Sequence, residues 1–299
     1  MSDLHTSSSL QRINLMIIGA QKAGTTSLKE YLGEHPALKT HLHKEFSYFF
    51  DDADYAEGYA KALKKYFPDA TPKQQLIAKN ACLYTSEEGI KRLRDHNPAC
   101  QVVILLRNPV QRTYSAFLME KNYGHIHIPF HEMKAIVKKA DHTDWRFSYL
   151  IGMSLYDRHL EMIYRYFPKE QVTIIRYEDL NSKPAEVCRT IFVKLGVDAG
   201  FAPNTEVRHN VTHKTRSEKM GRMITNLLRN NNRIKKIAHL FLPGRADYKA
   251  GELLRKANLT KARHEPIDPE MADFLKQYYK PHNEQLGQLT GMNFSDWNK

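Results

Sequence analysis

The sequence predicts an α/β fold in which a central parallel sheet is flanked by helices. Two observations predict it. Short apolar strand patterns alternate with helical patterns along most of the chain. The chain also has 299 residues, 41% of them apolar and 26% charged, enough to bury one large core. No linker rich in Gly, Pro or Ser divides it, so we expect a single domain over 1–299 with a flexible N-terminus at 1–12.

The first element is a buried strand over residues 13–18, which ends at Gly19. From Thr25, apolar residues at helical spacing predict a helix that ends near Pro36. The remaining pattern predicts a loop at 41–50, helix 55–67, strand 76–79, helix 86–95, strand 101–106, a helix after Pro109, helices 129–139 and 144–167, strand 171–176 and helix 184–195. Glu178 and Asp179 follow the last strand and are interpreted as a helix start, where carboxylates favour the positive end of the helix dipole.

Segment 208–263 carries the charge excess of the chain. It holds 15 Lys and Arg against three acidic residues, which equals the net charge of +12 for the whole sequence. Its apolar residues recur at helical spacing, so we expect mainly helical structure that forms a lid or flanks a substrate. Peripheral contact with a membrane surface is the alternative.

Three cysteines are too few for a disulfide framework, and no CxxC pair indicates a metal knuckle. No apolar run approaches the roughly 20 residues of a transmembrane helix, and the first residues lack the apolar core of a signal peptide. These features predict a cytoplasmic protein without a transmembrane segment.

The loop between the first strand and the first helix has the pattern of an anion-binding site. Its spacing is G-x-x-x-x-G, from Gly19 to Gly24, but Thr25 stands where a nucleotide P-loop has lysine, and Lys22 lies inside the loop. Loop N–H groups and a helix N-terminus attract phosphate. The sequence therefore predicts a P-loop-like fold. The expected ligand-binding residues of the loop are Lys22, Ala23, Gly24, Thr25, Thr26 and Ser27.

A second anion site is predicted where the strand 101–106 ends. An NTPase would place a magnesium-binding aspartate there, whereas this strand is followed by Arg107, with Ser115 eight residues further on. The carboxyl ends of parallel strands face the ligand crevice, and a guanidinium suits a phosphate. Two separate anion sites favour a nucleotide with two separated phosphate groups.

These motifs together resemble a known family. The segment 22–27 resembles the 5′-phosphosulfate loop of sulfotransferases that use 3′-phosphoadenosine 5′-phosphosulfate (PAPS), and Arg107-Asn-Pro-x-x-Arg112-x-x-Ser115 resembles their 3′-phosphate motif. The segments 43–50, 79–84 and 267–297 are similar to the glycan branch, the heparan sulfate N- and O-sulfotransferases. Resemblance is weak between 121 and 260. Ser47 stands where the branch often has histidine, and Ala81 replaces a proline.

The resemblance implies the roles of several residues. Glu45 would be the general base, Lys22 would stabilise the leaving phosphate, and transfer would be in-line and need no metal. Lys44 and Lys79 would bind the acceptor, which would be a glycan or a small alcohol with a hydroxyl or amine group. Lys261 and Arg263, in place of the branch's Lys-Gly-Arg loop, would contact PAPS.

Three other interpretations remain open at this point. A nucleotide kinase or NTPase with an altered loop is disfavoured by the missing Walker lysine and aspartate. A basic nucleic-acid-binding module is disfavoured because the sequence has no motif of that kind, so we expect no nucleic-acid partner. The histidines at 41, 43, 125 and 127 together with Glu45 could bind a metal, although HxH pairs are common in a chain with 15 histidines.

Overall fold

The computed structural model describes residues 10–206 and 266–299. These residues fall into two compact units. The first comprises 10–112, 153–206 and 278–299, and the second comprises 113–152 and 266–277. The expectation of a single domain stays a prediction, and the basic segment 208–263 lies wholly outside the described residues.

The first unit is built around a five-stranded sheet with the order β2-β3-β1-β4-β5, in which all paired strands are parallel. The strands are β1 (Ile13–Gly19), β2 (Leu38–Thr40), β3 (Gln75–Lys79), β4 (Gln101–Leu106) and β5 (Val172–Arg176). β1 lies at the centre, and its apolar side chains are buried on both faces, as expected for a strand covered by helices on both sides.

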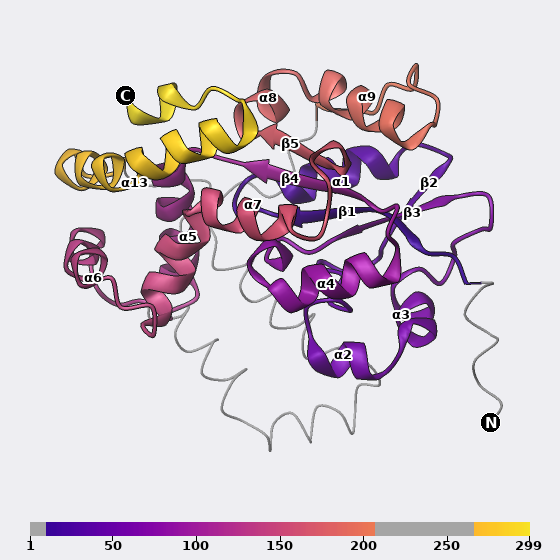
Figure 1. Cartoon of the computed structure of the whole chain (residues 1–299), viewed down its shortest axis with the longest axis horizontal. Coiled ribbons are helices and arrows are strands. Elements are labelled where there is room, and N and C mark those ends of the chain that lie inside the picture. The colour runs from indigo at the N-terminus through magenta and orange to yellow at the C-terminus, as the bar shows by residue number, and fades with distance from the viewer. Residues whose placement is uncertain (1–9, 207–265) are drawn as a thin grey trace. The chain divides into compact units, whose positions relative to one another are not determined.

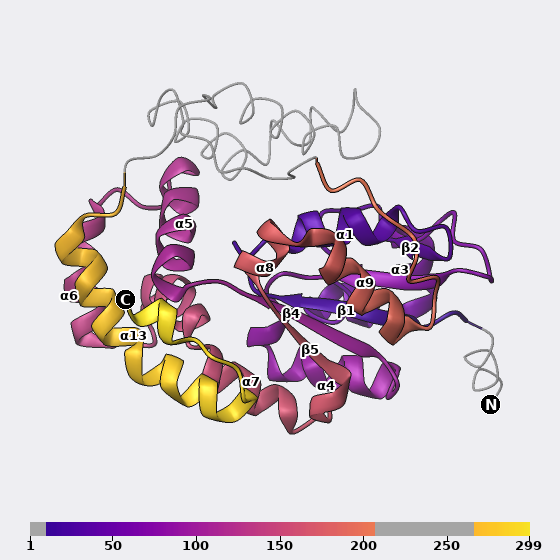
Figure 2. The ribbon, with the colours of Figure 1, turned by 90° about the horizontal axis from the view of Figure 1, so that it is seen from above.

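Helices cover both faces of the sheet (Figures 1 and 2): α1, α8 and α9 lie on one face, and α4 and α7 lie on the other. This is the predicted three-layer, P-loop-like fold. The described α-helices are α1 (Thr25–Gly33), α2 (Asp52–Ala56), α3 (Tyr59–Tyr66), α4 (Glu87–His96), α5 (Pro109–Asn122), α6 (Met133–Lys139), α7 (Tyr156–Tyr164), α8 (Tyr177–Ser182), α9 (Pro184–Leu195) and α13 (Pro269–Thr290).

Three details differ from the predicted elements. Strand β2 lies in a stretch where no strand was predicted. The helix predicted over 55–67 is two helices, because Gly58 adopts φ 84° and ψ 152°, outside the helical region. The helix predicted over 144–167 is also wrong. A π turn at Phe147–Ile151 and a 3₁₀ turn at Gly152–Ser154 precede α7, and the Met153 carbonyl there accepts a hydrogen bond from the buried Tyr84 hydroxyl at 2.6 Å.

The C-terminal segment completes the core of the first unit. Its apolar residues that carry the family resemblance are buried, including Tyr279, Leu286, Phe294 and Trp297. Asn283 is also buried and donates a hydrogen bond to the Asn298 side chain at 2.8 Å. The residues that carry the resemblance at this end of the chain are therefore explained by their packing in the core.

Candidate functional site

The loop between β1 and α1 holds an unusual backbone conformation at two residues. Lys22 (φ 71°) and Gly24 (φ 88°) are left-handed, and Gly24 directly precedes α1. The left-handed backbone favours glycine at position 24, and a Cβ there would also lie 2.9 Å from Leu180 Cδ2 and displace the end of that side chain. The first N–H groups of a helix have no partner inside that helix. The loop therefore presents N–H donors and the positive end of a helix dipole at one place.

Two arginines hold this loop by its carbonyl groups. Arg112 is completely buried, and its Nε donates to the Gln21 carbonyl at 3.2 Å while its Nη1 donates to Ser154 Oγ at 3.2 Å. Arg107 Nη1 donates to the Lys22 carbonyl at 3.1 Å. Because two consecutive carbonyls are held by guanidinium groups, the loop conformation is fixed by side chains that follow the neighbouring strand β4.

Arg107 is half-buried and keeps an unused donor. Its guanidinium lies over the Tyr177 ring, 4.6 Å from the ring centroid, and Tyr156 donates its hydroxyl to the Arg107 carbonyl at 2.9 Å. Its buried Nε has no hydrogen-bond partner within the described part of the chain. A buried charged donor without a partner is costly, and a bound anion would relieve the cost. Loop and arginine thus fit two anionic groups, as the sequence predicts.

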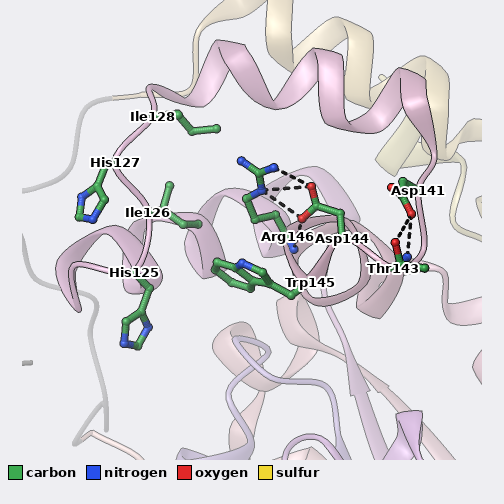
Figure 3. A pocket seen from close by; sticks show the side chains of 9 residues that line it. All are labelled: His125, Ile126, His127, Ile128, Asp141, Thr143, Asp144, Trp145 and Arg146. Carbon is green, nitrogen blue, oxygen red and sulfur yellow. Dashed lines mark hydrogen bonds and ion pairs between the residues drawn. The ribbon is translucent and has the colours of Figure 1, made fainter. Parts of the chain in front are cut away.

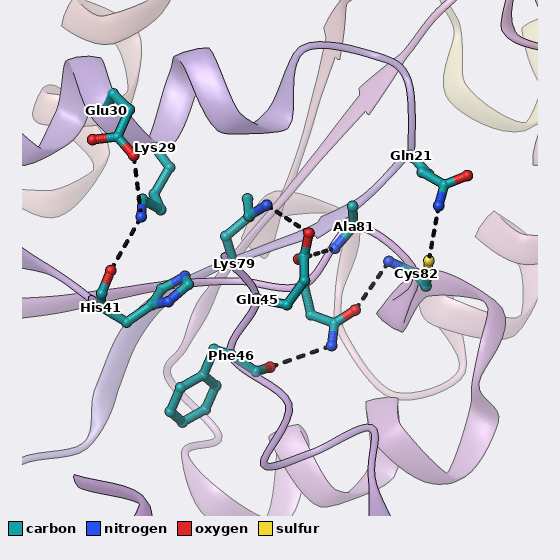
Figure 4. Close-up of polar contacts among 10 residues, drawn as sticks. Gln21, Lys29, Glu30, His41, Glu45, Phe46, Lys79, Ala81 and Cys82 are labelled. Atoms are coloured by element: carbon teal, nitrogen blue, oxygen red, sulfur yellow. Dashed lines mark hydrogen bonds and ion pairs between the residues drawn. The ribbon is translucent and has the colours of Figure 1, made fainter. Parts of the chain in front are cut away.

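Glu45 follows β2 in the sequence and lies against the carboxyl end of β3, the strand beside β1 in the sheet (Figure 4). Its Oε1 accepts from Lys79 Nζ at 2.8 Å, and its Oε2 accepts from the Ala81 N–H at 2.9 Å. The Phe46 N–H donates to the Lys79 carbonyl at 2.7 Å, which fixes the segment that carries Glu45 against the strand. The Asn80 N–H donates to the Ile17 carbonyl of β1 at 2.9 Å.

Lys79 and Glu45 form an ion pair of unequal exposure. The Lys79 side chain is 1% exposed and that of Glu45 is 32% exposed. Burial lowers the pKa of Lys79, while Glu45 opposes that shift. A buried ammonium group thus positions a carboxylate that still reaches solvent. Lys44, the neighbour in sequence, is exposed.

The structure therefore brings Lys22, Arg107, Glu45 and Lys79 to the carboxyl edge of three neighbouring strands, β3, β1 and β4. Of the loop hydroxyls, Thr25 is buried, whereas Thr26 and Ser27 are half-buried. Ser115 is buried on α5 in the second unit, and its role toward a ligand stays a prediction. Lys261 and Arg263 lie outside the described residues.

The histidines considered as metal ligands are in different surroundings. His41 is buried, and neither ring nitrogen has a hydrogen-bond partner in the described ranges. Burial holds the pKa of His41 well below its ordinary value, and the charge of Lys29 acts in the same direction. Among residues 10–206 and 266–299, no three His, Cys, Asp or Glu side chains form a group that could hold a metal ion.

Sequence reasoning missed three contributors to this site. Arg112 was part of the quoted motif, but its role is to hold the Gln21 carbonyl. The Ala81 N–H binds Glu45 through the backbone and leaves no sequence signal. Tyr177 follows the strand predicted at 171–176 as Arg107 follows the strand at 101–106, and the pairing of Leu106 with Arg176 makes the two residues neighbours.

Comparison with known proteins gives concordant results. A model of the sulfotransferase domain family matches residues 12–290. Mouse heparan sulfate glucosamine 3-O-sulfotransferase 5 is 29% identical over 173 residues, which cover 56% of this chain and 49% of that protein. The bifunctional heparan sulfate N-deacetylase/N-sulfotransferase 1 of Xenopus tropicalis is 23% identical over 285 residues, which cover 92% of this chain and 29% of that protein. The chain thus spans about half or less of the length of these relatives.

A solved structure supports the fold independently. The crystal structure of a sulfotransferase from Alicyclobacillus acidocaldarius superposes with a TM-score of 0.68 at 19% identity, covering 97% of this chain and 100% of that one. No helix within the described ranges combines the length and apolar character needed to cross a membrane.

Proposed function

The chain belongs to the sulfotransferase domain family, and from this premise we propose that it transfers a sulfuryl group from PAPS to a hydroxyl or amine acceptor. The observation that carries the proposal is the edge of the sheet. There, an anion-binding loop, an arginine with an unused buried donor and a positioned carboxylate lie at the carboxyl ends of three adjacent strands.

The donor would be held by the two anion sites. The residues from Lys22 to Ser27 would hold the 5′-phosphosulfate, and Arg107 would hold the 3′-phosphate. When bound, PAPS supplies the sulfuryl group and a phosphate oxygen on which negative charge grows during in-line transfer. The Lys22 ammonium would stabilise that charge.

Glu45 would take the proton of the acceptor. Lys79 and the Ala81 N–H hold its two oxygens at 2.8 and 2.9 Å, and each oxygen keeps a further lone pair. Its partial exposure leaves it accessible to a substrate. Lys44, exposed beside it, would contact the acceptor.

We infer that the acceptor is a glycan, because the relatives named above are heparan sulfate sulfotransferases. The basic segment 208–263 would flank an anionic or extended chain of this kind. A small neutral alcohol is the second candidate, which the expected cytoplasmic location favours. Exposed charges are screened within about 8 Å at physiological salt. Turnover of an anionic glycan should therefore fall steeply with ionic strength, and turnover of a neutral alcohol should not.

The test is transfer of radiolabelled sulfate from PAPS to unsulfated heparosan and to a panel of small alcohols, with enzyme, donor or acceptor omitted in turn. A thermal-shift series with 3′,5′-phosphoadenosine (PAP), ATP with Mg²⁺, and an oligonucleotide accompanies it. We expect labelled product and stabilisation by PAP alone. Stabilisation by ATP with Mg²⁺ or by the oligonucleotide, without transfer, would contradict the proposal.

A further inference from the structure

The second unit contains a pocket of about 460 Å³ (Figure 3). One part of its lining comes from the chain after α5, at His125–Ile128, and the other comes from the stretch before the π turn, at residues 141 and 143–146. A volume of this size is within the range of ligand-binding pockets. None of the residues placed at the sheet edge lines it.

The indole of Trp145 lies in the middle of this pocket in Figure 3 and is 46% exposed. The chain has two tryptophans, and the other, Trp297, is only 2% exposed. Large aromatic side chains usually bury most of their surface, and an exposed one inside a pocket offers a flat apolar face to a ligand. Ile126 and Ile128 add apolar surface to the lining.

The polar groups of the pocket are paired with one another. Asp144 accepts from Arg146 Nε at 3.0 Å and from Arg146 Nη2 at 2.6 Å, while Asp141 Oδ1 accepts from the N–H and hydroxyl of Thr143 at 2.9 and 2.6 Å. These hydrogen bonds lower the pKa of both carboxyl groups, so both are ionised at neutral pH. The lining residues thus carry two carboxylates and one guanidinium group.

The two histidines of the lining, His125 and His127, do not make the charges of the pocket favourable for an anion. His125 is bonded to the Glu120 carboxylate through Nδ1 at 2.7 Å, and Lys139 Nζ lies 3.7 Å from Asp141 Oδ2, so one carboxylate and one ammonium group lie beside the pocket. An anionic ligand would therefore find no net positive charge among the described lining residues. A ligand with hydroxyl groups would find both donors and acceptors, because carboxylate and imidazole groups accept and the guanidinium donates.

We propose that this pocket binds an uncharged sugar ring of the acceptor, with the C–H face of the ring on the Trp145 indole and its hydroxyls toward Asp144, Arg146 and the imidazoles. This rests on the proposed function, in which the acceptor is a glycan. It refines that function, because the pocket would select a neutral ring such as N-acetylglucosamine, while cationic groups elsewhere would meet any anionic rings.

Trp145 itself provides the readout. In a Trp297→Phe variant, Trp145 is the sole tryptophan, and its exposed indole should emit at long wavelength. Titration with chitotriose, a neutral oligomer of N-acetylglucosamine, should shift that emission to shorter wavelength and saturate. Glycerol at equal hydroxyl concentration, which has no ring face, should leave it unchanged. An unchanged spectrum with chitotriose, or an equal shift with glycerol, would overturn the proposal.

Variants separate the pocket from the donor site. Trp145→Ala should raise the KM for a heparosan oligosaccharide at least tenfold, and Trp145→Phe should restore most of the affinity. Both should leave stabilisation by PAP unchanged. Val193→Ala removes an apolar side chain that is 63% exposed on α9 and serves as the matched control. If Trp145→Ala leaves the KM unchanged, the pocket proposal fails although transfer continues; absence of transfer in every variant, with no PAP stabilisation, would instead contradict the proposed function.

Discussion

The carboxyl edge of the sheet and the pocket around Trp145 are built in different ways. The edge is held by buried partners far apart in sequence, such as Arg112 with the Gln21 carbonyl and Lys79 with Glu45. In the pocket, the pairs Asp144–Arg146 and Asp141–Thr143 join residues two apart, His125 and Glu120 are five apart, and the central indole is exposed. Substitutions that leave a buried partner unpaired at the edge should therefore affect folding as well as function. Substitutions in the pocket should change ligand binding alone.

The largest expected effect is that of Glu45→Gln, which should lower kcat about 10²–10⁴-fold, the usual contribution of a general base. PAP binding should remain within threefold, because the hydrogen bonds of Glu45 to Lys79 and Ala81 tie it to the end of β3. Glu57→Gln, which removes an exposed carboxylate of an i,i+4 ion pair, is the matched control and should keep full turnover.

Glu45→Gln also leaves the buried Lys79 ammonium group without its carboxylate partner, which destabilises the fold. The double variant Lys79→Met/Glu45→Gln removes both charges and should recover thermal stability without recovering turnover. If stability and turnover recover together, the defect of the single variant lies in folding, and Glu45 is not the base.

Gly24→Ala should destabilise the chain by about 2–3 kcal/mol, because it combines a left-handed backbone with a close contact to Leu180. Gly196 is also left-handed (φ 66°, ψ 29°), but nothing lies within 4 Å of its Cβ position. Gly196→Ala should therefore cost only about 1 kcal/mol in urea unfolding. If both substitutions lower the free energy of unfolding equally, the contact with Leu180 adds nothing to the cost of Gly24→Ala.

A smaller effect is expected from pH. His96 accepts a hydrogen bond from the Ile13 N–H at 3.2 Å, and burial lowers its pKa from 6.5 to about 4. Below pH 6.5, His96 binds a proton in the unfolded chain, whereas in the folded chain it stays neutral until the pH approaches 4. The stability contribution is present above that pH and is lost as the pH falls toward 4.

Between pH 7 and pH 5, this loss should amount to about 1–2 kcal/mol of the unfolding free energy. His96→Gln should remove it, whereas His142→Gln, at an exposed histidine of the second unit, should leave it unchanged. An equal acid dependence in the wild type and in His96→Gln would contradict this interpretation.

The sheet edge could be predicted because its parts leave local signals. Gly19, Gly24 and Lys22 mark the loop, and Arg107 stands at the end of an unmistakable strand. Parallel strands then bring both ends to one edge without any knowledge of tertiary packing. The prediction that Lys22 and Arg107 follow neighbouring strands is confirmed by the pairing of β1 with β4 and by the 3.1 Å hydrogen bond.

The remaining parts depend on tertiary contacts that leave no periodic pattern. The hydrophobic spacing over 144–167 predicts one helix, but buried partners from other segments take up the backbone and side chains at Met153 and Ser154. The pocket forms at the start of that predicted helix, and its other wall is the loop His125–Ile128, which no sequence pattern places beside it.

The sheet edge is expected to bind two separate phosphate groups of one nucleotide. Measuring two nucleotides against the wild type and one variant tests this most directly. Calorimetry measures the Kd of PAP and of 5′-AMP, which lacks the 3′-phosphate, for the wild type and for Arg107→Ala. A charge-assisted contact predicts that the wild type binds PAP about 30-fold more tightly than 5′-AMP, or about 2 kcal/mol, and that Arg107→Ala reduces this ratio to about threefold or less. An unchanged ratio in the variant, or a wild type that does not distinguish the two nucleotides, would contradict the account.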